Sequence, residues 1–146
     1  MKSKNVLLVL MTMLLFQCAS EKPAADQPKT AAAENSVRNI SVEDAKSLME
    51  KNPEAIILDV RTPEEYDGVL GHISGSILKP VQEIDTWAPE FANRKNAEIV
   101  IFCRSGGRSG RAAKYLNDLG FRNIINVEGG MTAWNEKGFP VEKGDN

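Results

Sequence analysis

One cysteine in the second half of the chain stands in a setting that favours its ionisation. Cys103 follows the apolar run 98–102 and precedes the amphipathic stretch 109–119, so it lies where a buried strand ends and a helix begins. Backbone N–H groups converge at helix N-termini and lower the pKa of a thiol placed there. Because the thiolate is the nucleophilic form of cysteine, Cys103 is the candidate catalytic residue.

The residues that follow Cys103 form a candidate anion-binding loop. Gly106 and Gly107 can adopt backbone angles closed to other residues, which lets successive N–H groups point at one centre. Arginines at positions 104, 108 and 111 add three cations with no acidic side chain among them. A cysteine after a strand is often an inert core residue, but this setting favours chemistry. The candidate loop residues are Arg104, Ser105, Gly106, Gly107, Arg108 and Ser109.

Strand and helix patterns alternate along the rest of the chain, which predicts an α/β fold with a parallel sheet. Apolar runs predict strands at 37–40, 55–60, 76–78, 98–102 and 124–127. Capping residues and apolar periodicity predict helices after Ser41 and Thr62, and at 85–94, 109–119 and 131–137, with Pro89 bending or dividing the third. Sites in parallel sheets form beyond the carboxyl ends of the strands, where Cys103 is expected.

The first residues have the pattern of a targeting segment. Lys2 and Lys4 give a basic start, and residues 6–16 are apolar except for Thr12. This run is too short to span a bilayer as a helix, but it matches the hydrophobic region of a secretory signal. We therefore expect residues 1–17 to be a signal peptide.

The end of this segment, Leu15-Phe16-Gln17-Cys18, resembles the lipobox of bacterial lipoproteins, in which the cysteine becomes the lipidated first residue. Gln17 departs from the small residue that those proteins place before the cysteine. Ordinary signal-peptidase cleavage is the alternative, although residues 12–18 contain no small-x-small motif. We expect lipidation at Cys18 and a membrane-anchored protein of the bacterial cell envelope, facing the periplasm or at the outer membrane.

Composition separates a tether from the globular part and excludes some functions. Residues 18–36 are rich in Ala, Lys, Glu, Pro and Gln without apolar periodicity, which predicts a flexible tether before a domain at 37–146. The net charge is −2, so we expect no nucleic-acid partner. One histidine and the one cysteine that remains beside Cys18 do not make a zinc site, and we expect no cofactor.

Residues 38–142 resemble the single-domain rhodaneses, a family of sulfurtransferases. Five motifs carry the resemblance in the family's order: Asp59-Val60-Arg61, Gly71-His72-Ile73-x-Gly75-Ser76, Cys103-Arg104-Ser105-Gly106-x-Arg108-Ser109, Glu128-Gly129-Gly130-Met131-x-Ala133-Trp134 and Gly138-Phe139-Pro140-Val141. The resemblance implies a rhodanese-like α/β fold, with a five-stranded parallel sheet flanked by helices on both faces.

The resemblance also implies sulfur transfer through a persulfide on Cys103. The N–H groups of residues 104–109 would stabilise the thiolate and the persulfide. Arg104 and Arg108 would orient a small anionic sulfur donor such as thiosulfate, and a thiol or cyanide would accept the sulfur. Asp59 and Arg61 are interpreted as supports of the rim, with direct catalysis as the alternative. His72 is interpreted as a loop anchor in preference to a general base.

Two rival functions remain open at this point. Related phosphatases carry a Cys-x5-Arg loop around phosphate, but four residues separate Cys103 from Arg108 here, and the tighter ring suits one sulfur better. The second rival is a membrane-tethered persulfide carrier or redox partner that serves one protein acceptor. Carrier and enzyme need the same loaded cysteine, so the sequence does not separate them.

Overall fold

The computed structural model describes residues 36–144. The expected signal peptide, the expected tether up to residue 35 and the expected lipidation site Cys18 lie outside the described residues. Within residues 36–144, no helix has both the length and the apolar character needed to cross a membrane.

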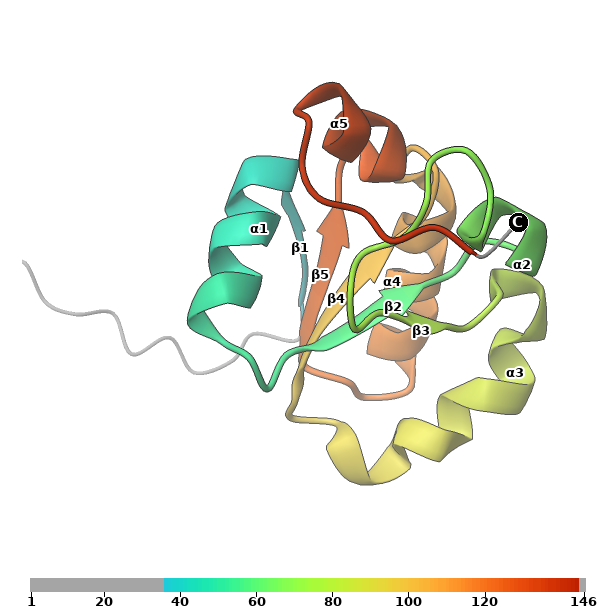
Figure 1. Cartoon of the computed structure of the whole chain (residues 1–146). Coiled ribbons are helices and arrows are strands. Elements are labelled where there is room, and N and C mark those ends of the chain that lie inside the picture. Colours follow the sequence, from blue (N-terminus) through green and yellow to red (C-terminus); the bar gives the residue numbers. More distant parts are fainter. Residues whose placement is uncertain (1–35, 145–146) are drawn as a thin grey trace, which may run out of the picture. The chain divides into compact units, whose positions relative to one another are not determined.

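Five parallel strands form a single sheet in the order β1-β5-β4-β2-β3 (Figure 1). This confirms the predicted fold class. The register pairs Asp59 of β2 with Phe102 of β4, so the residues that follow these two strands meet at one edge of the sheet. The strands are β1 (Ser36–Ile40), β2 (Ile56–Asp59), β3 (Ile77–Leu78), β4 (Glu98–Phe102) and β5 (Asn123–Val127).

The helices follow the predicted order, and some of their bounds differ from the prediction. They are α1 (Val42–Lys51), α2 (Pro63–Tyr66), α3 (Ile84–Trp87), α4 (Gly107–Asp118) and α5 (Gly130–Glu136), with 3-10 turns η1 (Val81–Glu83) and η2 (Ala88–Arg94). The predicted helix 85–94 is divided at Ala88, because Pro89 has no N–H to donate and its ring crowds the preceding turn. The prediction that the helix after the cysteine starts at 109 was wrong, since α4 starts at Gly107.

The two faces of the sheet bury separate apolar clusters, because neighbouring residues of a strand point to opposite faces. Ile99 and Ile101 of β4 pack in one cluster with α3 and α4, which includes Trp87. Val100 and Phe102 pack in the other with α1 and α5, which includes Trp134. Helices therefore cover both faces of the sheet (Figure 1). The carboxyl ends of β2, β4 and β5 are held at one edge as a rigid base.

Capping side chains fix the first residues of α1 and α2. Ser41 caps α1 by accepting a hydrogen bond from the N–H of Asp44 at 3.1 Å. Thr62 and Glu65 form a reciprocal capping box at the start of α2. The capping box fixes the side chain of Glu65 at the edge of the sheet where β2 and β4 end.

Candidate active site

Cys103 immediately follows β4, and its side chain is fully buried beneath the loop that leads into α4. The N–H of Gly106 donates a hydrogen bond to Sγ at 3.1 Å. The hydroxyl of Ser109 lies 3.3 Å from the same sulfur and 3.1 Å from the carbonyl oxygen of Gly106. Sγ is therefore surrounded by neutral hydrogen-bond donors.

These donors determine the ionisation of the thiol. Burial of the sulfur opposes its ionisation, and the Ser109 hydroxyl is the strongest of the groups that favour it. The backbone N–H groups of Ser109, Ser105 and Gly106 add to this effect. The donors outweigh burial, so the pKa of Cys103 is lowered from its ordinary value. Of the N–H groups at 104–109, those of residues 105, 106 and 109 act on the sulfur.

Gly106 makes this arrangement possible through its backbone conformation. Its φ is +95°, in the left-handed region that L side chains rarely adopt, and it caps the N-terminus of α4. A Cβ at this position would lie 3.2 Å from the carbonyl oxygen of Val127. The turn at Gly106 directs its own N–H back to Sγ and starts α4 at once.

The N-terminus of α5 supports the other side of the cysteine loop. The N–H of Met131 donates to the carbonyl of Cys103 at 2.9 Å, and the N–H of Thr132 donates to the carbonyl of Arg104 at 3.0 Å. Gly130 packs against the same peptide, and a Cβ there would lie 2.3 Å from the carbonyl oxygen of Cys103. The turn after β5 is therefore part of the machinery that holds the cysteine.

Asp59 and Arg61 form a buried ion pair below the rim of the site. Nη2 of Arg61 lies 2.6 Å from Oδ2 of Asp59, and both side chains are fully or almost fully buried. Arg61 also donates to the carbonyl oxygens of Glu65 at 2.9 Å and Gly71 at 2.7 Å. The pair thus ties the end of β2 to α2 and to the following loop.

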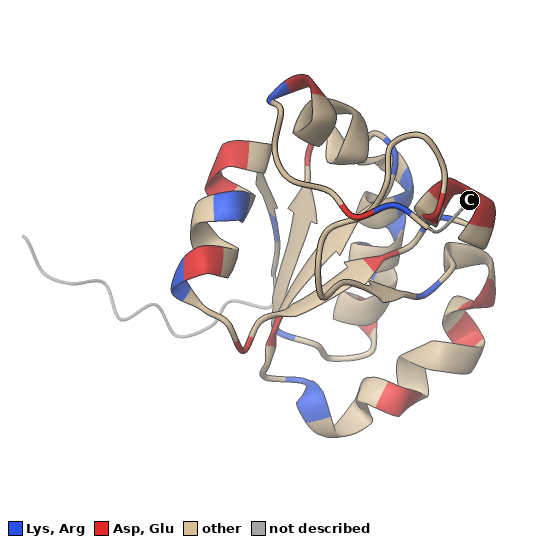
Figure 2. Cartoon of the chain, in the orientation of Figure 1, with Lys and Arg blue, Asp and Glu red and all other residues tan. Residues whose placement is uncertain are grey.

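The side chain of Arg108 is engaged in an ion pair. Its two Nη atoms each lie 2.6 Å from one carboxylate oxygen of Glu65, in a bidentate ion pair. This hydrogen bonding lowers the pKa of Glu65 to about 2. The sequence shows no acid among the loop arginines, but the fold brings one from α2. Figure 2 shows acidic residues on α2 and basic residues around the start of α4.

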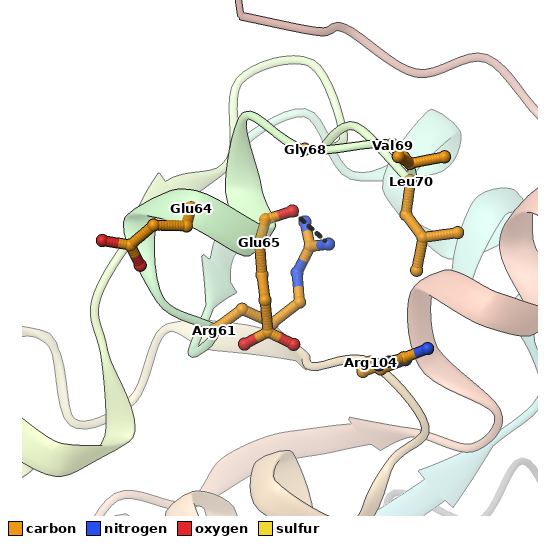
Figure 3. A pocket seen from close by; sticks show the side chains of 7 residues that line it. All are labelled: Arg61, Glu64, Glu65, Gly68, Val69, Leu70 and Arg104. Atoms are coloured by element: carbon orange, nitrogen blue, oxygen red, sulfur yellow. Dashed lines mark hydrogen bonds between the residues drawn. The ribbon is translucent and has the colours of Figure 1, made fainter.

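Arg104 has a different environment from Arg108. It is exposed, and no hydrogen bond or ion pair to its side chain occurs among residues 36–144. It borders a pocket of about 180 Å³, whose wall includes Arg61, Glu64, Glu65, Val69, Leu70 and Arg104 (Figure 3). Arg111 is exposed on α4, away from this wall. Only one of the three predicted loop cations therefore borders the pocket.

His72 makes the contacts expected of a residue that anchors its loop. Its ring stacks on that of Tyr66, with 3.7 Å between centroids, and its Nδ1 lies 3.2 Å from the Tyr66 carbonyl oxygen. The backbone of His72 exchanges two hydrogen bonds of 2.8 Å with Glu142. These contacts fasten the loop after α2 to the C-terminal segment.

Comparison with known families agrees with this geometry. The family model described as the rhodanese-like domain matches residues 41–137. The chain belongs to the rhodanese-like family. This confirms the resemblance drawn from its five motifs, and the matched range contains the cysteine loop, the Asp59–Arg61 pair and Glu65 of this rhodanese-like domain.

Curated relatives of this rhodanese-like domain, and solved structures similar to it, include sulfur-handling proteins. A sulfurtransferase of Allochromatium vinosum is 31% identical over 72% of this chain and 94% of its own length. The putative sulfur carrier protein YrkF of Bacillus subtilis is 39% identical over 70% of this chain and 54% of its own. The polysulfide-sulfur transferase of Wolinella succinogenes is 29% identical with a TM-score of 0.63, covering 79% of this chain and 85% of its own.

Several of the curated relatives are much longer than this rhodanese-like domain. The chain spans about half of YrkF, and about a third of a rhodanese-like/PpiC domain-containing protein of Arabidopsis thaliana. The domain therefore occurs both alone and within larger chains.

Two contributors to the site were not singled out from the sequence. Glu65 was not singled out from the sequence, and its partner Arg108 lies 43 residues later. Gly130 was noted in a motif, without its contact to the Cys103 carbonyl. The capping-box spacing of Thr62 and Glu65 shows that the glutamate is held in place, but a contact this distant along the chain has no local signal.

Proposed function

We propose that this rhodanese-like domain is a sulfurtransferase that carries sulfane sulfur as a persulfide on Cys103. The observation that carries the proposal is the sulfur itself, which is held by the N–H of Gly106 and the hydroxyl of Ser109 and has a lowered pKa. A lowered pKa increases the fraction of the nucleophilic thiolate, and the same donors would stabilise the anionic terminal sulfur of a persulfide.

The first transfer would load the cysteine. The Cys103 thiolate attacks the outer sulfur of a donor such as thiosulfate, and a new S–S bond forms. The bond between that sulfur and the sulfonate sulfur breaks, and sulfite leaves with the electron pair. The total negative charge does not change in this step, so no proton is taken up. The preorganised donors around the site stabilise that charge.

The second transfer would discharge the cysteine. A nucleophilic acceptor, either cyanide or a thiolate, attacks the terminal sulfur of the persulfide. Its bond to Cys103 breaks, and the electron pair returns to the Cys103 thiolate. The acceptor leaves as thiocyanate or as a new persulfide, and no external oxidant or reductant is consumed.

A small anionic sulfane-sulfur compound is the proposed donor. Exposed Arg104 borders the pocket beside the loop and can attract an anion there. Thiosulfate fits this description, and so does a polysulfide anion, which is the donor named for the Wolinella relative. A phosphatase reaction fits less well, because Arg108, the arginine that would have to hold phosphate, is bound on both Nη atoms by Glu65.

The alternative is a persulfide carrier that serves one specific protein. The burial of Cys103 favours the carrier, because a sulfur buried beneath the loop is shielded from unspecific reaction with small thiols. The similarity to a putative sulfur carrier protein also supports it. In that case the domain would load with sulfur but turn over slowly on small acceptors.

One assay separates these functions. The purified chain is incubated with thiosulfate and cyanide, and thiocyanate is measured beside a Cys103→Ser control. Multiple turnovers that the control abolishes support the enzyme. Loading by a single sulfur atom without turnover supports the carrier, and hydrolysis of an aryl phosphate without sulfur loading would contradict both.

We further propose that the domain is tethered in the bacterial cell envelope by a lipid on Cys18. The basic start, the apolar run 6–16 and the lipobox-like end of the signal support this location. The test expresses the native chain and a Cys18→Ala variant in bacteria and follows their partition into detergent. Loss of detergent partition in the variant supports the anchor, and unchanged partition would contradict it.

A further inference from the structure

The three arginines at 104, 108 and 111 have unequal access to a ligand. Both Nη atoms of Arg108 are bound by Glu65, and its guanidinium charge is thereby balanced. Arg61 borders the pocket, but its charge is balanced by Asp59. Arg104 is the exposed cation of the pocket wall, without an ion pair among the described residues. Of the two arginines in the pocket wall, Arg104 is therefore the one whose charge is not balanced by an ion pair among the described residues.

Hydrogen bonds to neighbouring residues hold Glu65 in position to pair with Arg108. Its carboxylate accepts from the Thr62 N–H at 3.3 Å, and its own N–H donates to Thr62 Oγ1 at 3.4 Å. Its carbonyl oxygen accepts from Arg61, which is anchored on buried Asp59. These three contacts hold Glu65 on the side away from α4. Its neighbour Glu64 also borders the pocket, but its side chain points away from Arg61 and Arg104 (Figure 3).

We propose that Glu65 is a specificity-determining residue: it engages Arg108 and leaves Arg104 as the loop arginine that acts on an anionic sulfur donor. The inference rests on the proposed function, because it describes how the same site selects its donor. Each available cation attracts a dianion more strongly than a monoanion, so the engagement of Arg108 by Glu65 weakens the preference for dianions that two available arginines would give. Release of Arg108 would shift the preference towards dianions such as thiosulfate.

The size of the effect follows from Coulomb attraction. One added positive charge beside a site open to water raises the reaction rate of a monoanion about threefold, and that of a dianion about tenfold. A neutral reagent is unaffected by the charge, so it serves as the internal reference.

The test uses alkylation of Cys103, which requires no sulfur transfer. All variants carry Cys18→Ala, because the chain has two cysteines and Cys103 must be the only thiol. The readout is the rate with iodoacetate, an anion, divided by the rate with neutral iodoacetamide. This ratio cancels changes in the nucleophilicity of the sulfur. If sulfur transfer is never detected, the ratio still reports on the role of Glu65.

Glu65→Gln is expected to raise the ratio about threefold, and Arg104→Gln to lower it about as much. The double variant Glu65→Gln/Arg108→Gln is expected to stay within about twofold of the parent, because it removes a balanced pair. Asp118→Asn is the matched control, because it also removes the acid of an ion pair, here with Lys114 on α4, but does not border the pocket; it should change the ratio less than Glu65→Gln.

Two outcomes would overturn the proposal. One is an unchanged ratio in Glu65→Gln. The other is a ratio in the double variant that falls as far as in Arg104→Gln, because Arg108 would then attract anions directly in the native protein. If Glu65→Gln alone does not fold, the double variant and Arg104→Gln still make this second comparison.

Discussion

The Ser109 hydroxyl lies 3.3 Å from Sγ of Cys103 and 3.1 Å from the Gly106 carbonyl oxygen, so its single proton has two possible acceptors. A thiolate is the stronger acceptor, because hydrogen bonds to charged groups exceed those between neutral groups. When Cys103 ionises, the Ser109 hydroxyl therefore donates its hydrogen bond to the sulfur. This contact makes Ser109 the residue on which the reactivity of the cysteine depends most.

Ser109→Ala is predicted to raise the pKa of Cys103. At a pH below that pKa, the alkylation rate with iodoacetamide should fall about tenfold, since a hydrogen bond to a charged group contributes about 1.5 kcal/mol or more. The measurement is the alkylation rate against pH, in a Cys18→Ala background. Ser105→Ala is the matched control, because Ser105 acts on the sulfur through its backbone N–H. A midpoint that does not move in Ser109→Ala would refute this role.

Gly130→Ala is predicted to destabilise the fold and slow the reaction of Cys103. The new Cβ would lie 2.3 Å from the Cys103 carbonyl oxygen, and the φ of +51° is itself unfavourable for alanine. Gly138 has a φ of +66° with nothing within 4 Å of a Cβ, so Gly138→Ala isolates the conformational cost. Urea unfolding should show Gly130→Ala to be less stable than Gly138→Ala by about 1–3 kcal/mol. Equal stabilities would contradict the close packing of α5 on the loop.

Glu65 is predicted to stabilise the fold at neutral pH through its ion pair with Arg108. Folding lowers its pKa from 4.5 to about 2, so the stabilisation is present in full above pH 4.5 and is lost as the pH falls towards 2. The difference in the free energy of unfolding between wild type and Glu65→Gln should therefore shrink over this range. Denaturant unfolding at a series of pH values measures it. A difference that stays constant with pH would show that the carboxylate charge has no part in stability.

Asp59→Ala is predicted to destabilise the fold strongly. It would leave the guanidinium of Arg61 buried without its charge partner, which costs about 3–5 kcal/mol. The double variant Asp59→Ala/Arg61→Met removes both charges and should recover part of this loss. The measurement is the free energy of unfolding of both variants. A double variant less stable than Asp59→Ala would show that the other hydrogen bonds of Arg61 outweigh its unpaired charge.

Local sequence patterns predicted the strands, most helices and the position of Cys103, because these depend on apolar periodicity, capping residues and glycine. The unbroken apolar run 99–102 and the pair Gly106-Gly107 place the cysteine at a strand end before a helix. The start of α4 was predicted two residues late, because glycines are poor helix formers and only the turn at Gly106 shows that the helix begins there.

The charge arrangement of the site could not be predicted in the same way. Arg108 and Arg104 look equivalent in the sequence, but one is bound by Glu65 and the other is exposed at a pocket. This difference arises from the pairing of β2 with β4, which brings α2 beside the start of α4. Contacts between residues so distant along the chain depend on the complete fold.

Intact mass measurement of the chain after incubation with thiosulfate tests sulfur loading on Cys103 most directly. The account predicts that the Cys18→Ala variant gains the mass of one sulfur atom, that peptide mapping places it on Cys103, and that cyanide removes it as thiocyanate. Cys103→Ser should gain nothing under the same conditions. A Cys103 that reacts readily with iodoacetamide but accepts sulfur from neither thiosulfate nor polysulfide would contradict the account.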